Sequence, residues 1–196
     1  KMNFEPINQT KLFGINDTLH KLINLYEEDR LPNKILLSGQ KSIGKFTLAL
    51  HLINYVLSKN EDLPYDKKNC FINPNNRSYK LTLNKSNPNL FLVDVDSEKK
   101  NIDINQIRDL IVKLNKSSFN NKPRFVLIDN IEYLNINSIN ALLKIIEEPN
   151  DKVLFLLIQD SKKKIINTLT SRCIKFNMFL NNETKDEIIE KLLNNN

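Results

Sequence analysis

The sequence has few of the residues that would suggest a disulfide-rich, zinc-binding or membrane-spanning protein. Its 196 residues include three glycines, two cysteines and no tryptophan. Cys70 and Cys173 are too few for a disulfide framework or a four-ligand zinc site. No apolar run approaches the ~18 residues of a membrane span, and residues 1–6 carry no apolar signal segment. We therefore expect a soluble, cytoplasmic protein with reduced cysteines, no zinc and no membrane contact.

The charge balance is basic but only weakly informative. Lys and Arg number 29 against 23 Asp and Glu, which gives a formal net charge of +6. Such a charge permits binding to nucleic acid or to an acidic partner, although the chain is also rich in Asn, Lys and Ile, as low-GC coding produces. The best local candidate for contact with DNA is the run Lys162, Lys163 and Lys164, near an expected helix start. A charge run of this kind is more often a solvated surface.

Apolar runs of strand length alternate with stretches of helical period. This alternation predicts a parallel sheet whose strands are joined by crossover helices, with helices on both faces. The runs are nearly continuous in Ile, Leu, Val and Phe, as expected for strands buried on both sides. The five predicted strands are Lys34 to Ser38, Leu90 to Asp94, Arg124 to Asp129, Val153 to Gln159 and Cys173 to Asn177.

The intervening segments show helical signals. Asp103 and Gln106 have the spacing of a capping box, and a stripe from Ile136 to Ile146 stops before Pro149. Further helices are predicted around Leu19 to Tyr26 and over Gly44 to Leu57. We expect a core domain over residues 1–178 with a polar surface insertion at 58–88, followed at 179–196 by the start of a helical lid. On this prediction the chain ends before any further domain.

The most informative motif is Gly39-Gln40-Lys41-Ser42-Ile43-Gly44-Lys45-Phe46-Thr47, directly after the first predicted strand. The phosphate-binding loop of nucleotide-binding proteins has the pattern G-x-x-x-x-G-K-[ST]. In that pattern backbone N–H groups surround the phosphates, Lys reaches the terminal ones, and the final hydroxyl binds Mg²⁺. Gly39, Ser42, Gly44, Lys45 and Thr47 are therefore the candidate nucleotide-binding residues of this loop.

One part of the loop is missing, because Phe46 stands where the hydroxyl belongs. Thr47 lies one residue further along, about 100° around a helix, and cannot simply take over the same coordination position. ATP binding by the retained parts and a ligand-free turn between strand and helix both remain open, and no metal-binding residue is predicted. Hydrolysis is the least favoured outcome.

A second departure follows the strand that ends at Asp129. In phosphate-loop enzymes such an Asp helps to hold Mg²⁺, which makes Asp129 a further candidate nucleotide-site residue. The next residue, often a Glu that orients the attacking water, is Asn130 in this chain. An amide can hold a water molecule but cannot take its proton. Without the upstream loop, Asp129 would be interpreted as a carboxylate that caps a turn.

A third element is Ser171-Arg172-Cys173, just before the last strand. Arg172 presents a planar, permanently charged fork that suits a γ-phosphate. We expect the phosphate loop to lie on a different edge of the sheet from Arg172, so that Arg172 is better placed to act on a neighbouring subunit in trans. In isolation, the tripeptide would be interpreted as a surface Arg beside a partly buried Cys.

Together with these motifs, the segment Asn140-Ala141-Leu142-Leu143-Lys144-Ile145-Ile146-Glu147-Glu148-Pro149 resembles the clamp-loader branch of the AAA+ ATPases. The resemblance extends from Gly14 to Asn177 and implies an AAA+ type P-loop NTPase core. Two carboxylates in a last helical turn oppose the helix dipole, which suggests that Glu147 and Glu148 serve contacts rather than helix stability.

The departures at Phe46 and Asn130 resemble the delta-prime subunits of bacterial DNA polymerase III clamp loaders. That resemblance implies a subunit whose Arg172 acts on the ATP of a neighbouring gamma/tau-like motor subunit. It also implies a delta-like partner, a sliding clamp, and primer-template DNA reached through the complex. By the same resemblance, relatives often carry a four-Cys zinc module in the region of residues 58–88, which Cys70 alone cannot form. Relatives also continue into a helical collar, which we do not expect within residues 1–196.

Two enzymatic alternatives remain. The first is a motor-type ATPase of the gamma/tau class in which Thr47 or a shifted Mg²⁺ shell restores hydrolysis; Phe46 and Asn130 argue against it. The second is a small phosphotransferase, which would need a hydroxyl at position 46 and a cluster of phosphate-binding arginines. The chain has five arginines, at positions 30, 77, 108, 124 and 172, and they form no cluster in the sequence.

Overall fold

The computed structural model describes residues 5–96, 98–148, 152–180, 184–186 and 190. Two compact units make up the chain. The first, here called the helical unit, comprises residues 1–31, 42–83 and 178–196; the second, here called the sheet unit, comprises residues 32–41 and 84–177. Pro149 and most of the predicted lid segment 179–196 lie outside the described residues, although residues 184–186 and 190 are helical.

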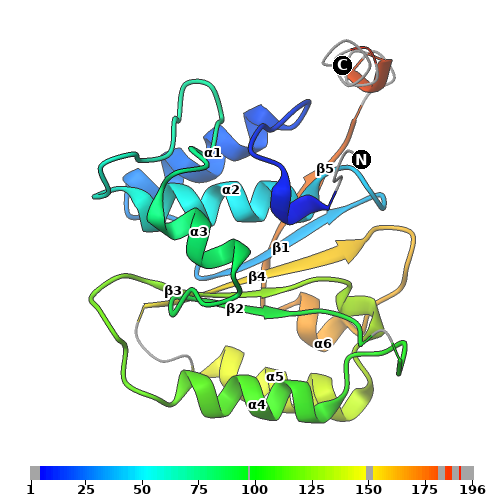
Figure 1. Cartoon of the computed structure of the whole chain (residues 1–196). Helices are drawn as coiled ribbons and strands as arrows, with labels where there is room; N and C mark the ends of the chain where they lie inside the picture. The colour runs from blue at the N-terminus through cyan, green and yellow to red at the C-terminus, as the bar shows by residue number, and fades with distance from the viewer. Residues whose placement is uncertain (1–4, 97, 149–151, 181–183, 187–189, 191–196) are drawn as a thin grey trace. The chain divides into compact units, whose positions relative to one another are not determined.

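The sheet unit is built on five strands in the order β2-β3-β4-β1-β5 (Figure 1). The pairs β2/β3, β3/β4 and β4/β1 are parallel. All five predicted strands are confirmed, with ends that differ from the prediction by one residue at most. Their bounds are β1 Lys34–Gly39, β2 Leu90–Val93, β3 Arg124–Ile128, β4 Val153–Asp160 and β5 Ile174–Met178.

Strand burial explains why the sequence shows continuous apolar runs rather than alternation. Every residue of β3 is buried, as are the last five of β1. Arg124 is the polar exception in β3: its Nη1 donates to the carbonyl oxygens of Leu114 at 2.8 Å and Lys116 at 3.1 Å. Since a buried cation needs partners, these two bonds allow an arginine to open a core strand.

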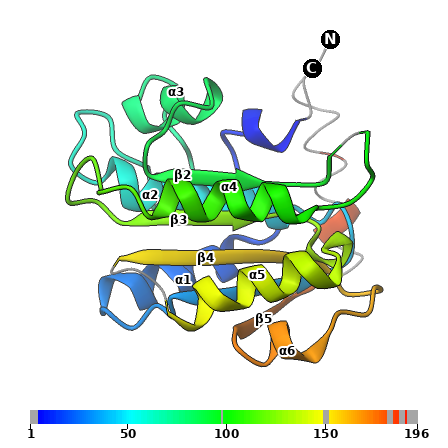
Figure 2. The same cartoon turned by 90° about the horizontal axis from the view of Figure 1, so that it is seen from below.

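Two amphipathic helices, α4 (Ile104–Leu114) and α5 (Ile136–Glu147), lie side by side and cover one face of the sheet (Figure 2). The predicted capping box is confirmed: Asp103 Oδ1 accepts from Gln106 N at 3.1 Å, and Gln106 Oε1 accepts from Asp103 N at 3.0 Å. Asn135 caps α5 by accepting from Ser138 N at 2.9 Å. The apolar stripes of both helices join one core with strand residues such as Val126, Phe155 and Leu157.

The helical unit contains α1 (Asn16–Glu27), α2 (Lys45–Ser58), α3 (Arg77–Leu83) and the short 3-10 helix η1 (Pro6–Asn8) (Figure 1). The two helices predicted before and after the first strand are confirmed. Helix α2 is buried on nearly all sides: thirteen of its fourteen residues, all except Phe46, are buried. Within the described ranges, none of the helices combines the length and hydropathy that a membrane span requires.

The prediction of a polar surface excursion at residues 58–88 is wrong in part. This segment contains α3 and buries four large side chains in the helical unit: Tyr65, Cys70, Ile72 and Tyr79. Sequence periodicity missed them because the segment is held by polar contacts rather than by an apolar stripe. Asn54 Nδ2 donates to Asn76 Oδ1 at 3.2 Å, and Asn76 Nδ2 donates back to Asn54 Oδ1 at 2.9 Å.

A second polar contact fastens the same segment to α2. His51 is fully buried, with Nδ1 2.8 Å from the hydroxyl of Tyr65 and Nε2 3.0 Å from the carbonyl oxygen of Gln9. A carbonyl oxygen can only accept, so Nε2 carries the proton and Nδ1 accepts from the tyrosine hydroxyl. Burial lowers the pKa of His51 to about 4, while the bond to Gln9 opposes that shift. His51 is therefore neutral near pH 7.

Candidate functional site

The loop between β1 and α2 has the backbone of a phosphate-binding turn. Ser42 and Gly44 both adopt left-handed backbone angles, with φ of 64° and 91°. Gly44 lies directly before α2, and a Cβ there would stand 3.1 Å from Ile15 Cδ1, which leaves little room for a side chain. Glycine is thus required at position 44 by both backbone angle and packing. The geometry places backbone N–H groups at the start of a helix, as phosphate binding needs.

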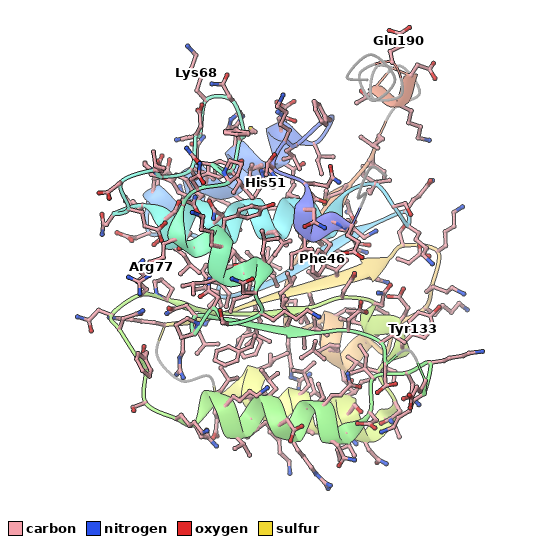
Figure 3. All side chains as sticks on the ribbon, viewed as in Figure 1. Phe46, His51, Lys68, Arg77, Tyr133 and Glu190 are labelled. Atoms are coloured by element: carbon pink, nitrogen blue, oxygen red, sulfur yellow. The ribbon has the colours of Figure 1, made fainter. Side chains whose placement is uncertain are left out.

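The first turn of α2 carries the candidate lysine and threonine. Lys45 and Thr47 are only 6% and 8% exposed, whereas Phe46 between them is half-buried. Phe46 is labelled in Figure 3. Because Lys45 and Thr47 are equally buried, burial does not distinguish their roles, and that Thr47 does not replace the missing Mg²⁺ ligand stays a prediction. Among the residues that the structure describes, no three His, Cys, Asp or Glu side chains gather as a metal site would require.

The carboxyl ends of β2 and β3 bring Asp94, Asp129 and Asn130 together. Asp129 N donates to the carbonyl oxygen of Val93 at 2.9 Å, and Asp129 Oδ1 accepts from Asn130 N at 2.8 Å. Asn130 has a left-handed backbone, with φ of 54°, and its Nδ2 donates to Asp94 Oδ1 at 2.8 Å. The amide that stands in place of a catalytic Glu is therefore fixed by Asp94. It has no capacity to accept a proton from water.

Asp94 is a neighbour that the sequence analysis did not select. It was counted as the last residue of a predicted strand, although the strand ends at Val93. A signal was available: Asp94 and Asp129 each follow an apolar run, and the carboxyl ends of parallel strands share one edge of a sheet. Gly39 ends β1 on that same edge, with β4 between β1 and β3. Ser42, Gly44, Lys45 and Thr47 belong to the helical unit.

Arg172 is held firmly within the sheet unit. Its Nε donates to Glu147 Oε1 at 2.6 Å, its Nη2 lies 2.6 Å from the same oxygen, and its Nη1 donates to the carbonyl oxygen of Thr168 at 2.7 Å. The side chain is still 37% exposed. The prediction that Glu147 serves a contact is confirmed, and the contact is Arg172 itself. Burial raises the pKa of the adjacent Cys173 thiol to about 11, so this cysteine is protonated near pH 7.

Arg172 comes just before β5, the edge strand next to β1, whereas Gly39 ends β1. The sequence did not reveal that β1 and β5 are neighbours. That the phosphate loop and Arg172 lie on different edges of the sheet stays a prediction. Lys162, Lys163 and Lys164 are exposed in the turn after β4, shortly before the short helix α6 (Asn167–Thr170).

Comparison with known proteins identifies the family. A family model described as "DNA polymerase III, delta subunit" matches residues 14–181. The chain belongs to this family. It is 34% identical to the DNA polymerase III subunit delta' of Buchnera aphidicola subsp. Baizongia pistaciae over 171 residues. The matched region covers 84% of the chain and 48% of the relative. The delta' subunit of Bacillus subtilis is 28% identical over 174 residues, or 87% of the chain and 50% of the relative.

Other members of the DNA polymerase III group also match. The gamma/tau subunit of Mycoplasma genitalium is 29% identical over 189 residues, which is 96% of the chain and 30% of that protein. Among solved structures, a gamma subunit-related protein of Thermotoga maritima has a TM-score of 0.59 at 21% identity, over 89% of the chain and 49% of that protein. The chain spans about half or less of the length of these relatives. The predicted AAA+ type P-loop fold and the resemblance to delta-prime subunits are confirmed.

Proposed function

We propose that the protein to which this chain belongs is a delta-prime-like clamp-loader subunit that supplies Arg172 to ATP bound by a neighbouring gamma/tau-like motor subunit. The observation that carries the proposal is how the Arg172 guanidinium is oriented and bonded. Glu147 and the Thr168 carbonyl occupy three of its N–H groups, out of the five that arginine has. Two N–H groups remain for a phosphate, on a side chain that is already oriented.

The phosphate loop of the chain itself supports a subunit without turnover. Phe46 offers no oxygen to Mg²⁺, Thr47 lies one residue further around the helix, and Asn130 is bonded to Asp94 and cannot act as a base. If ATP binds, Gly39, Ser42, Gly44 and Lys45 would hold its phosphates through backbone N–H groups and one cation. This arrangement anchors a nucleotide without providing the parts that hydrolyse it.

The partners follow from the proposed role. A trans-acting arginine needs a neighbour with an intact ATP site, and gamma/tau subunits are among the similar proteins. In this proposal the ring of subunits, including a delta-like member, opens a sliding clamp and places it on primer-template DNA. The decisive experiment is reconstitution of the loader from purified motor, delta-like and full-length delta-prime-like subunits. Clamp loading and DNA-stimulated ATP turnover are expected only when the full-length protein is present.

The isolated chain is expected to show no ATP turnover above background, because both hydrolytic positions are altered. A steady-state phosphate-release assay at pH 7 with Mg²⁺ tests this expectation, with Lys45→Ala as the matched control. A titration of ATP with and without Mg²⁺ should show no gain in affinity from the metal. Robust turnover that Lys45→Ala abolishes would instead identify a motor-type subunit of the gamma/tau class.

Replacing Glu147 with alanine should weaken the trans effect without removing the arginine. Loss of the Glu147 carboxylate leaves Arg172 attached only through Thr168, and misplacing a catalytic group by about 1 Å costs up to about 100-fold in rate. We expect DNA-stimulated turnover of the reconstituted loader to fall by about 10-fold to 100-fold. Glu148→Ala is the control, because its carboxylate makes no bond among the described residues. Equal losses in both variants would contradict the positioning role.

A further inference from the structure

The sheet unit has a polar groove that the proposed function does not use. It lies beside α6 and the start of β5, which are neighbours in Figure 2. Its volume of about 610 Å³ is in the range of small-molecule sites. The turn after β4 forms one wall, and it is fixed by two backbone bonds: Ser161 N donates to the Gly39 carbonyl at 3.0 Å, and Lys163 N donates to the Asp160 carbonyl at 2.9 Å.

Three lysines supply positive charge to the groove. Lys163 and Lys164 come from the turn, and Lys175 comes from β5. All three are exposed, and within the described part of the chain their ammonium groups make no ion pair or hydrogen bond. Among the residues that the structure describes, no acidic one lines the groove. Three lysines that line one groove without a counter-charge favour a ligand with several negative charges.

The groove also presents hydrogen-bond acceptors, which a simple anion would not satisfy. Gln159, at 7% exposure, lines the groove, and its Oε1 is buried without a partner among the described residues. Its Nε2 donates to the Lys163 carbonyl oxygen at 3.2 Å, which fixes the orientation of the amide. A buried carbonyl oxygen without a donor is unfavourable, so a ligand that donates to it would be stabilised.

Two hydroxyls in the lining add to this acceptor character. Thr170 Oγ1 donates to the Asn167 carbonyl at 3.3 Å, and Ser171 Oγ donates to the Thr168 carbonyl at 3.3 Å. Each O–H group already donates to a backbone carbonyl. The two hydroxyl oxygens can therefore act toward a ligand only as acceptors. The ligand should therefore combine anionic groups with N–H or O–H donors.

We propose that this groove is a nucleotide-binding site separate from the phosphate loop, in which Lys163, Lys164 and Lys175 hold the phosphates. Amino or hydroxyl groups of the nucleoside then donate to Gln159 Oε1 and to the hydroxyl oxygens of Thr170 and Ser171. Inorganic phosphate at neutral pH lacks most of these donors. An acidic peptide has donors but would also bury apolar side chains, and Ile165 is the one apolar residue of the lining.

The experiment measures binding of unlabelled ATP by calorimetry and of a 12-residue single-stranded oligodeoxynucleotide, labelled at its end, by fluorescence anisotropy. Both use the 196-residue chain at low salt. The ATP measurement tests for a site that takes a free nucleotide, and the oligodeoxynucleotide measurement tests for a site that takes a nucleotide within a DNA strand. We expect binding in at least one arm, and the groove variants described next distinguish this binding from any binding at the phosphate loop. Competition with inorganic phosphate and with polyglutamate at matched charge should be weak.

The variants test the groove itself. Joint replacement of Lys163, Lys164 and Lys175 by alanine should lower affinity at least about tenfold, because charge-assisted bonds to phosphate are lost. Gln159→Leu should lower it several-fold, with thermal unfolding used to confirm that the variant folds. The matched control is Lys162→Ala, which removes one charge from the same turn but does not line the groove, and should have little effect.

Three results would overturn the proposal. They are absence of binding in both arms, an equal effect of Lys162→Ala and Lys163→Ala, and equal competition by polyglutamate. The second would indicate diffuse electrostatic attraction, and the third would indicate a site for an acidic peptide. Because the measurement uses the chain alone, its failure leaves the proposed trans role of Arg172 untouched, and failure of that role leaves the groove untouched.

Discussion

Replacing Arg172 with alanine in the full-length protein is expected to lower DNA-stimulated ATP turnover of the reconstituted loader by about 10³-fold or more, the effect typical of arginine fingers. The transferred phosphoryl group spreads negative charge over its oxygens, and a guanidinium that is already oriented stabilises that charge without reorganising. Arg172 meets this condition through its bonds to Glu147 and the Thr168 carbonyl. Single-turnover measurements at saturating ATP would isolate the chemical step.

Two control variants make the Arg172 result interpretable. Arg172→Lys keeps the charge but loses the planar fork, so only partial activity is expected. Arg108→Ala removes an exposed arginine from α4 that makes no bond within the described residues, and should leave turnover unchanged. Turnover that is unchanged in Arg172→Ala would show that Arg172 serves to join α5 to α6 and has no part in the neighbouring ATP site.

The second large effect concerns acid stability of the chain. The pKa of His51 is lowered from 6.5 to about 4 by burial, so the folded state takes up this proton less readily than the unfolded state does. Stability from the neutral imidazole is fully present above about pH 6.5 and is lost as the pH falls toward 4. A shift of this size corresponds to about 3 kcal/mol of unfolding free energy across that window. Urea unfolding at a series of pH values measures it.

The pH effect can be assigned to His51 by comparison of histidine variants. His51→Gln should be less stable at pH 7, because Tyr65 and Gln9 lose their ring partners, but its stability should vary less between pH 6.5 and 4. The chain has one other histidine, His20, and His20→Gln should keep the steep dependence of the unsubstituted chain. Parallel pH profiles for His51→Gln and the unsubstituted chain would rule out His51 as the cause.

Periodicity predicted most of the fold because the sheet unit depends on apolar burial. The five strands and the capping box before α4 follow directly from residue types and spacing. Residues 58–88 were predicted poorly for the opposite reason. Their attachment to α2 uses the paired amides of Asn54 and Asn76 and the ring of His51, and such polar contacts leave no periodic signal in the sequence.

The candidate site was predicted in its parts but not in its arrangement. The loop residues follow β1 and Asp129 follows β3, as predicted. These positions were predictable because each motif lies within a few residues of its strand. The fixing of Asn130 by Asp94 and of Arg172 by Glu147 depends on contacts 36 and 25 residues apart. The sequence also did not reveal that β1 and β5 are neighbours in the sheet. Contacts between distant residues and strand order are set by the whole fold, which explains why single motifs did not reveal them.

The left-handed turn at Gly44 bears on how degenerate loops of this kind should be recognised in other sequences. Since the backbone angle and the closeness of Ile15 both favour glycine, folding alone is a reason for glycine at position 44, independent of any ATP turnover. Lys45 is likewise buried in the first turn of its helix. A genome survey that counts Gly-Lys pairs would therefore overestimate the number of working ATPases. The chemically informative positions are those equivalent to 46 and 130, because the residue types there decide whether a Mg²⁺ ligand and a base are present.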